Sequence, residues 1–270
     1  ATGDILSMNS LEIKKPVVSI NELQVKFKSD GETVIAVNKV SFNVHAGETV
    51  CLVGESGSGK SVTSLSLMRL VEFGGGEITN GSLVLERNNK QVKNLVEADA
   101  STMRSIRGNE VGMIFQEPMT SLNPVFTIER QLTDGLRLHT NLTGGETREK
   151  ALQLLKEVRI PDPEKRLRQY PHELSGGMRQ RVVIAMAMAC RPRLLIADEP
   201  TTALDVTIQA EILALINRLK HETGMAVLFI THDMAVVAQM ADRVVVMYRG
   251  NMIEEGPMEK IFSEPREDYT

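Results

Sequence analysis

Gly54-Glu55-Ser56-Gly57-Ser58-Gly59-Lys60-Ser61 is the stretch of sequence that decides the fold. It follows a short apolar run at 49–53 and precedes a segment with helical periodicity, which gives the order strand, glycine-rich loop, helix. In that order, the pattern G-x-x-x-x-G-K-[ST] is typical of a phosphate-binding loop. The glycines let backbone N–H groups face a phosphate, Lys60 reaches the β- and γ-phosphate oxygens, and Ser61 can ligate Mg²⁺. The plain structural alternative is a Gly-Ser loop before a core helix.

The segments around this loop predict an α/β fold with a parallel sheet. Two-residue alternation at 23–27 and 40–44, with turn residues between them, predicts an antiparallel β layer upstream of the loop. Downstream, β and α patterns alternate and predict right-handed crossovers between parallel strands. The expected elements are strands 49–53, 111–115, 194–197 and 226–230, helices from 60, at 176–189 and at 206–220, and a final β pair within 243–255.

A helical subdomain is expected at about 117–173, because this region has helical periodicity and no strong strand pattern. With 270 residues and 42% hydrophobic content, the chain is long enough for one α/β domain that carries such a lobe. We therefore expect a single domain over 17–270, preceded by an extension at 1–16. The expected fold is a RecA-like P-loop core with a parallel sheet, an N-terminal antiparallel β subdomain and an inserted α-helical subdomain.

Composition and charge exclude several classes of protein. The formal net charge is −4 with acidic and basic residues interspersed, so no broad basic surface for nucleic acid is expected. The longest apolar run, 182–190, is shorter than the roughly 20 residues that a membrane-spanning helix needs. The first residues do not resemble a secretion signal, which favours the cytoplasm. The missing initial Met suggests a piece of a longer chain.

An apolar strand that ends in two carboxylates, Leu194-Leu-Ile-Ala-Asp198-Glu199, is the second informative motif. Ligands of open α/β sheets bind at the carboxyl ends of the strands, so these acids should face the phosphate loop. Asp198 can then hold Mg²⁺ through its water shell, and Glu199 can polarise an attacking water or accept its proton. A solvated strand end is the structural alternative.

The segment Leu174-Ser175-Gly176-Gly177-Met178 is the third motif. A Ser followed by two glycines at a helix start predicts a second anion-binding site in the same chain. For the tetrad alone, an N-capped helix with a tight packing contact is the better interpretation.

Together these motifs resemble those of the ABC transporter ATPases, whose signature sequence is a close variant of Leu-Ser-Gly-Gly-Gln. The elements from Phe27 to His232 follow the family's order and spacing. The resemblance implies ATP and Mg²⁺ as cofactors and a head-to-tail dimer. In that dimer, Ser175, Gly176 and Gly177 of one subunit would cap the γ-phosphate held by Lys60 of the other.

The resemblance also implies roles for polar residues that follow the predicted strands. Gln116 resembles the glutamine that contacts Mg²⁺ and the attacking water, and it would join Glu199 and His232 as a catalytic residue. His232 resembles the switch histidine that hydrogen-bonds the γ-phosphate, and Asp205 resembles the acid of the D-loop. Without the family, each would read as an ordinary polar loop residue.

Two further ATP contacts follow from the resemblance alone. Phe27 lies where the family places an aromatic ring that stacks on adenine, and a ring face is all that stacking requires. Without the family, Phe27 would be assigned to the core. Val62 stands where the family usually has Thr or Ser, which leaves backbone contacts to the α-phosphate.

The segments 116–124 and 170–181 look like those of the oligopeptide, dipeptide and nickel importer subfamily, closest to the first ATPase half of the glutathione importer type. This implies an ATP-hydrolysing subunit that powers a peptide importer by dimer closure. The implied partners are a second, identical or paralogous ATPase domain, two transmembrane permease subunits and, indirectly, a solute-binding protein. The implied location is the cytoplasmic face of the bacterial inner membrane, as a peripheral protein.

Three other classes share part of this pattern. ABC ATPases of DNA repair or chromosome architecture usually insert a long coiled coil or a zinc module, and no heptad run is seen here. Translation-associated ABC proteins normally carry two motor domains and a basic linker. A small-molecule P-loop kinase would lack the 174–178 motif. A regulatory or orphan ATPase stays open as a fourth alternative.

Overall fold

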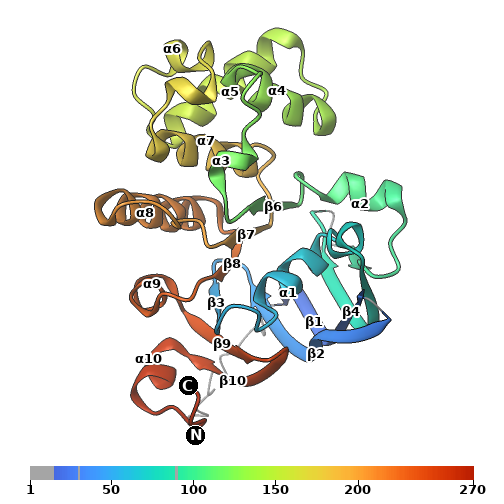
Figure 1. The fold of residues 1–270 in the computed structure, drawn as a ribbon. Coiled ribbons are helices and arrows are strands. Elements are labelled where there is room, and N and C mark those ends of the chain that lie inside the picture. Colours follow the sequence, from blue (N-terminus) through green and yellow to red (C-terminus); the bar gives the residue numbers. More distant parts are fainter. Residues whose placement is uncertain (1–14, 30, 89–90) are drawn as a thin grey trace, which may run out of the picture.

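The computed structural model describes residues 15–29, 31–88 and 91–270 (Figure 1). Residues 1–14 of the predicted N-terminal extension lie outside the described part. Within it, the strands form two sheets, and the first strand begins at Pro16. The expected α/β architecture with an antiparallel layer, a parallel sheet and a helical region is present.

The smaller sheet is antiparallel, with strand order β2-β1-β4-β5. Its strands are β1 (Pro16–Ser29), β2 (Glu32–His45), β4 (Gly76–Glu86) and β5 (Val92–Asn94). The alternation that predicted β1 and β2 has a direct structural cause, because residues such as Ile20, Phe42 and Val44 point into a buried core. Both strands are longer than the predicted segments. The sequence analysis did not predict β4 and β5.

The larger sheet has the order β10-β9-β3-β8-β7-β6. Its strands are β3 (Thr49–Val53), β6 (Val111–Ile114), β7 (Leu194–Asp198), β8 (Ala226–Ile230), β9 (Arg243–Tyr248) and β10 (Asn251–Pro257). The strands from β9 to β6 are paired in parallel, and β10 pairs with β9 in the antiparallel sense. This confirms the predicted parallel sheet and the final β pair.

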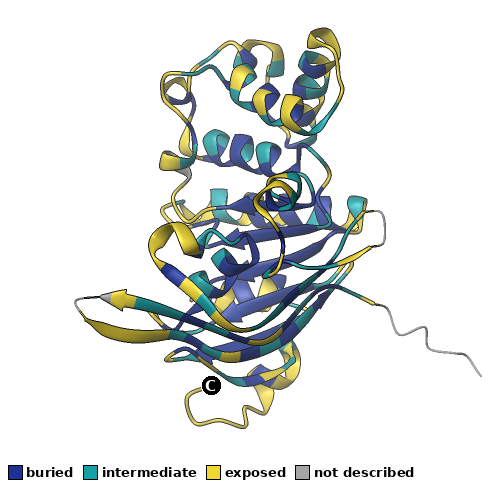
Figure 2. Cartoon of the chain, turned by 90° about the vertical axis from the view of Figure 1, so that its right-hand side faces the viewer, coloured by how far each residue is buried: buried dark blue, intermediate teal, exposed yellow. Residues whose placement is uncertain are grey.

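Both faces of the parallel sheet are covered, as Figure 2 shows by its continuous dark layer. In β7, Leu194 and Ile196 join the core between the two sheets, whereas Leu195 and Ala197 join the core on the helical side. In β8, Leu228 and Phe229 divide in the same way. Strands buried on both faces read as continuous apolar runs, which is why these segments were predictable.

The helices connect and cover these sheets (Figure 1). Those of the core are α1 (Lys60–Leu67), η1 (Val71–Gly74), α2 (Ala100–Ile106), α7 (Gly176–Met188), α8 (Val206–Thr223), α9 (Met234–Met240) and α10 (Met258–Ser263). Between β6 and α7 the chain forms only helices, namely α3 (Pro118–Ser121), α4 (Ile128–His139), α5 (Gly144–Glu157), α6 (Pro163–Leu167) and η2 (Pro171–Glu173). No helix of the described part is long and apolar enough to cross a membrane.

The helices α4 to α6 share one hydrophobic cluster with α7, α8 and the parallel sheet. Leu132 and Leu136 of α4, Leu154 of α5 and Val183 of α7 are buried members of it. Helix α4 starts at an N-cap, where the Thr127 hydroxyl accepts the N–H of Arg130. The lobe therefore rests on the same helix that carries the Ser-Gly-Gly motif.

A substitution at Gly112 of β6 would test how closely α7 packs on the sheet. A Cβ at this position would overlap the carbonyl oxygen of Ala187 in α7, so Gly112→Ala should lower the free energy of unfolding by about 1–3 kcal/mol. Gly135→Ala in α4 is the matched control, because open space surrounds that position and alanine favours a helix by about 0.5–1 kcal/mol. Urea unfolding of both variants measures the difference. If Gly112→Ala were as stable as wild type, α7 would be able to move away from β6 without a loss of stability.

Candidate functional site

The phosphate loop lies at the carboxyl end of β3 and is held by close backbone packing. Gly54 has φ +151° and Gly59 has φ +100°, both in a region that side chains rarely adopt. A Cβ on Gly59 would lie 2.6 Å from the Ala36 carbonyl oxygen, and a Cβ on Gly54 would overlap that of Met247. Both glycines are therefore needed for the loop to pass this closely between β2 and β9.

Lys60 begins α1 and turns its ammonium group back over the loop. Its Nζ donates to the carbonyl oxygens of Gly54 at 2.7 Å and Glu55 at 2.8 Å, and lies 3.3 Å from the Ser58 hydroxyl. Burial lowers the pKa of Lys60, and the carboxylates of Glu199 and Asp198 oppose that shift. The cation is thus partly desolvated near two acids at the carboxyl end of β7.

Asp198 is the last residue of β7 and is only 5% exposed. Burial raises its pKa, the Ser61 hydroxyl bonded to it and Lys60 lower it, and Glu199 raises it further. Its Oδ1 atom is buried without a hydrogen-bond partner among the described residues. An orphaned carboxylate oxygen beside a serine hydroxyl fits a hard cation such as Mg²⁺. Nowhere in the described ranges do three His, Cys, Asp or Glu side chains gather as a metal site.

Glu199 is the point on which the predicted catalytic side chains converge. Gln116 Nε2 lies 3.3 Å from Oε2, and His232 Nδ1 lies 3.1 Å from Oε1. The hydroxyl of Thr202 donates to Oε2 at 3.1 Å. Glu199 itself has φ +46°, and its N–H donates to the carbonyl of Ile230 in β8. The segments that follow β6 and β8 thus bring Gln116 and His232 to the carboxylate that follows β7.

A cavity of about 670 Å³ joins these parts at the carboxyl ends of the strands. Its lining is Ala36, Glu55, Ser56, Gly57, Gly59, Lys60, Ser61, Val62, Gln116, Glu199 and His232. The parallel arrangement places cations, acids and loop N–H groups around one space, as expected for this edge of an α/β sheet. The predicted phosphate loop and the predicted catalytic residues are thereby brought together.

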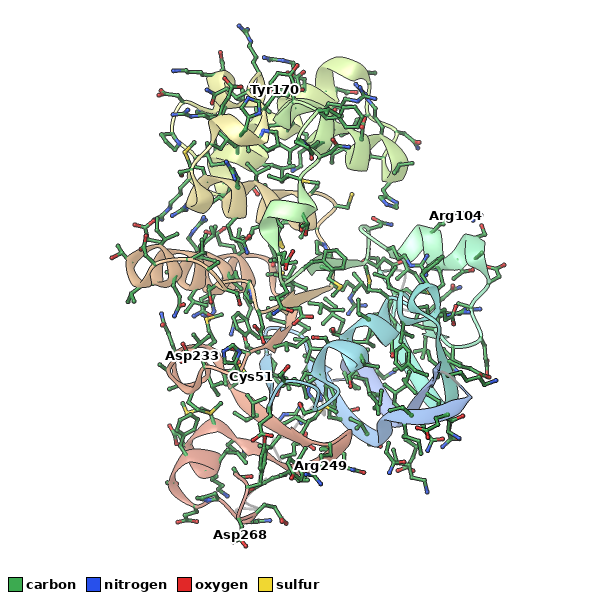
Figure 3. The ribbon with its side chains drawn as sticks, viewed as in Figure 1. Cys51, Arg104, Tyr170, Asp233, Arg249 and Asp268 are labelled. Carbon is green, nitrogen blue, oxygen red and sulfur yellow. The ribbon has the colours of Figure 1, made fainter. Side chains whose placement is uncertain are left out.

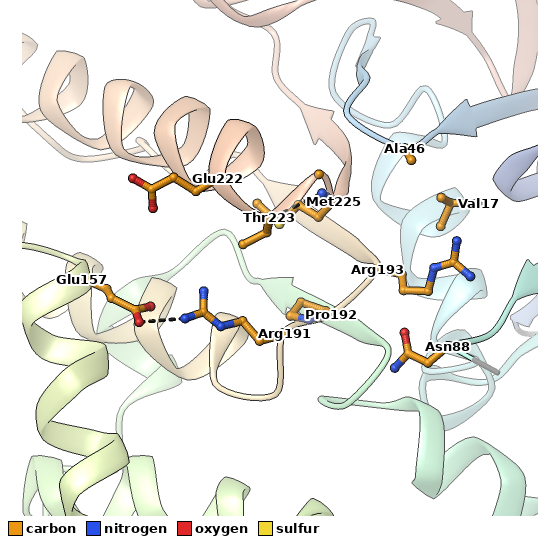
Figure 4. Close-up of a pocket in the computed structure, with 11 residues that line it drawn as sticks. Val17, Ala46, Asn88, Glu157, Arg191, Pro192, Arg193, Glu222, Thr223 and Met225 are labelled. Carbon is orange, nitrogen blue, oxygen red and sulfur yellow. Dashed lines mark hydrogen bonds and ion pairs between the residues drawn. The ribbon is translucent and has the colours of Figure 1, made fainter. Parts of the chain in front are cut away.

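A second cavity, of about 740 Å³, lies at the opposite, amino ends of the strands (Figure 4). It is lined by residues that directly precede strands, including Arg193 and Met225. Its arginines are already paired: Arg191 contacts Glu157 at 2.7 Å, and Arg193 donates to the carbonyls of Glu86 and Arg87. We do not assign a nucleotide to this cavity.

The Ser-Gly-Gly motif and Asp205 meet at another place in the fold and do not line the 670 Å³ cavity. Ser175 caps α7 by accepting the N–H of Met178, and Asp205 caps α8 by accepting the N–H of Ile208. A Cβ on Gly177 would lie 2.9 Å from Ile208, which joins the two helix starts tightly, whereas Gly176 has open space. The structure therefore contains both features of the structural interpretation of this motif, which are the N-cap and the tight packing contact.

Phe27 and Val62 have different positions. Val62 lines the cavity as predicted. Phe27 is half-buried near the end of β1, and its ring packs so close to Gly76 that a Cβ there would lie 2.8 Å from it. The ring of Phe27 does not line the cavity. Its adenine contact therefore stays a prediction.

Two residues of this region were missed by the sequence analysis. Ala36 lines the cavity from β2, and Thr202 orients Glu199. Ala36 has no motif, because only its backbone position matters. Thr202 lies three residues after Glu199, within reach of a local turn, so the adjacent Thr201-Thr202 pair was a usable signal.

Comparison with known proteins identifies the family. A family model described as "ABC transporter" matches residues 37–202. The chain belongs to this family. This confirms the expected ABC transporter ATPase and excludes the P-loop kinase alternative. A putative peptide import ATP-binding protein of Brucella melitensis is 54% identical over 257 residues, which cover 95% of this chain and 76% of that protein.

Further relatives agree with this assignment. The glutathione import ATP-binding protein GsiA of Escherichia coli (strain K12) is 54% identical over 254 residues, which cover 94% of this chain but 41% of that longer protein. Among solved structures, the dimeric post-hydrolysis state of the ATP-binding cassette MJ0796, bound to ADP and Pi, has a TM-score of 0.77 at 29% identity. That alignment covers 89% of this chain and 98% of the other, which confirms the expected fold.

Asp198→Asn should stabilise the protein when neither nucleotide nor Mg²⁺ is present. Because the folded-state pKa of Asp198 is raised, wild type loses stability as pH rises from about 4 through that pKa. The variant should therefore be more stable at pH 7, by about 1 kcal/mol, and the gain should fade towards pH 4. Denaturant unfolding at several pH values measures it, with exposed Asp134→Asn as control. A gain that does not depend on pH would contradict this account.

Proposed function

We propose that this chain is the ATP-hydrolysing subunit of an ABC importer for peptides and that it works as a head-to-tail dimer. The observation that carries the proposal is the convergence of Gln116, His232 and Thr202 on Glu199, next to the Lys60 loop. A base held from several sides beside a phosphate-binding loop is the arrangement that phosphoryl transfer to water requires.

The loop residues bind and orient the phosphates of ATP. The N–H groups at the start of α1 provide a positive electrostatic environment, and the ammonium group of Lys60 lies above the same loop. Its partial desolvation strengthens its attraction for a phosphate oxygen. We assign adenine stacking to Phe27 and α-phosphate contacts to the backbone of Val62.

Glu199 acts as the general base. A water oxygen attacks the γ-phosphorus, its proton passes to the Glu199 carboxylate, and the bond from phosphorus to the β-phosphate bridging oxygen breaks to give ADP and phosphate. His232 and Gln116 contact opposite oxygens of the carboxylate and fix its plane. The same two side chains can contact the γ-phosphate and the attacking water once ATP is bound.

Asp198, Ser61 and Gln116 would hold Mg²⁺ in this proposal. The orphaned Oδ1 of Asp198 and the neighbouring Ser61 hydroxyl support the assignment. When bound, Mg²⁺ supplies neutralisation of the charge that develops on the phosphates.

A dimer would complete the site. Ser175, Gly176, Gly177 and Asp205 lie apart from the cavity of their own chain, yet they offer a helix start and exposed backbone at Gly176. The dimeric cassette structure among the neighbours supports their use by a second subunit. Contacts to the γ-phosphate that exist only in the closed state would make ATP binding drive closure, and hydrolysis would reverse it.

Transport of peptides is supported by the names of the relatives, which are peptide and glutathione import proteins. The lobe of α4 to α6 shares its hydrophobic cluster with α7, so closure at the Ser-Gly-Gly motif would move it against two permease subunits. The longest of these helices, α5, has 14 residues, unlike the long coiled coils of chromosome-associated ABC ATPases. Such a role in an importer implies a peripheral position on the cytoplasmic face of the inner membrane. It also implies indirect contact with a solute-binding protein.

Glu199→Gln should abolish hydrolysis while it preserves ATP binding. Loss of the general base is expected to lower kcat by about 10²- to 10⁴-fold, and trapped ATP should produce a dimer in size-exclusion light scattering. Glu149→Gln, an exposed glutamate of α5, removes the same charge and should leave both unchanged. A Glu199→Gln variant that still hydrolyses ATP at the wild-type rate would rule out this base.

Mixing two inactive variants tests whether the site is shared between subunits. Lys60→Ala disables the phosphate loop, and Ser175→Arg blocks the motif at α7. In a head-to-tail dimer of the two chains, one of the two sites combines an intact loop with an intact motif. Equal mixing makes about half of the dimers mixed, so it should restore up to about a quarter of the hydrolysis. The mixture should be compared with each variant alone. No recovery, despite dimers that contain both chains, would contradict the head-to-tail arrangement.

A further inference from the structure

We propose that Tyr269 is a positioning residue for the phosphate loop, acting through the peptide group between Gly54 and Glu55 on Lys60. The proposal rests on the function assigned above. It concerns the last segment of the sequence, residues 264–270, which we call the strap. The strap passes beside the phosphate loop, although more than 200 residues separate the two in sequence.

One peptide group joins the strap to the lysine. The Glu55 N–H donates to the Tyr269 hydroxyl at 3.0 Å, and the carbonyl of the same peptide, that of Gly54, accepts from Lys60 Nζ at 2.7 Å. In a trans peptide the N–H and the C=O point in opposite directions, and the described chain contains no cis peptide. The Tyr269 hydroxyl and the ammonium therefore lie at opposite edges of the same peptide group.

This chain of contacts has a consequence for phosphate binding. A hydrogen bond to the N–H of an amide makes its carbonyl a better acceptor, and it also restrains rotation of the peptide plane. Gly54, with its φ of +151°, has the freedom to let that plane turn. Tyr269 thus limits the motion that glycine would otherwise allow, and it holds Lys60 over the loop before ATP arrives.

The strap is itself fixed at two points. The rings of Tyr269 and Tyr248 in β9 lie 4.5 Å apart, and the N–H groups of Arg266 and Glu267 donate to the Glu254 carboxylate at 2.9 and 3.3 Å. Figure 3 labels Asp268 of the strap at the end of the molecule that carries β9 and β10. The hydroxyl of Tyr269 is therefore presented by a supported ring and not by a loose end.

A cavity of about 500 Å³ separates the strap from the core and reaches the active-site residues. Gly54, Glu55 and His232 line it on the core side, and Phe262, Pro265 and Tyr269 line it on the other. The loop thus has free space beside it, and the bond to Tyr269 lies at the border of that space. Without this bond, we expect the 54–55 peptide to sample other orientations.

The test compares Tyr269→Phe with Tyr248→Phe in the 270-residue chain. Each change removes one hydroxyl from the same pair of contacting rings, but of the two only Tyr269 bonds to the loop. Fluorescent ATP-analogue titration and steady-state hydrolysis are measured for both, along with melting temperature. We expect Tyr269→Phe to raise Kd and KM for ATP about three- to tenfold with kcat nearly unchanged, and Tyr248→Phe to match wild type.

The route through Lys60 is tested by repeating Tyr269→Phe in a Lys60→Ala background. If Tyr269 acts by positioning this lysine, the second change should have no further effect on Kd. Equal effects of the two phenylalanine variants, or an undiminished effect of Tyr269→Phe without Lys60, would overturn the proposal. Failure of wild type to bind or hydrolyse ATP would instead contradict the proposed function, so the two failures are distinguishable.

Discussion

The parallel pairing of β3, β7 and β8 is the constraint on which the site depends. These strands bring residues from three distant parts of the sequence to one edge, where Lys60 follows β3, Asp198 and Glu199 end β7, and His232 follows β8. Each strand is fully buried, so its register is fixed by packing on both faces. The positions of the charged groups are therefore a result of apolar packing.

The charges themselves are incompletely balanced within the chain. Lys60 is desolvated and its partners are mainly carbonyl oxygens, while Asp198 keeps one oxygen without a partner. Both arrangements cost free energy within the chain, and both would be relieved by the proposed ligand, which brings phosphate oxygens and a cation. In the proposed function, the bound substrate would supply the opposite charges that these groups lack within the chain.

Sequence reasoning predicted the elements that are determined by the local sequence. The apolar strands, the glycine-rich loop and the α7 start were placed nearly to the residue, because each has its own chemistry. Strand β4 was missed, since Gly76–Glu86 has no clean alternation and depends on pairing with β1. The contact of Glu55 with Tyr269 depends on where the chain returns in space, which no pattern reveals. The roles of the site residues stay predictions.

Glu199 occupies a left-handed backbone conformation, at φ +46°. Such a conformation costs a residue with a Cβ about 1–2 kcal/mol relative to glycine. Any search for thermostable variants guided by folding alone would therefore favour a glycine at this position and would discard the carboxylate. With the role proposed for Glu199, selection for stability and selection for turnover would pull in opposite directions at this single position.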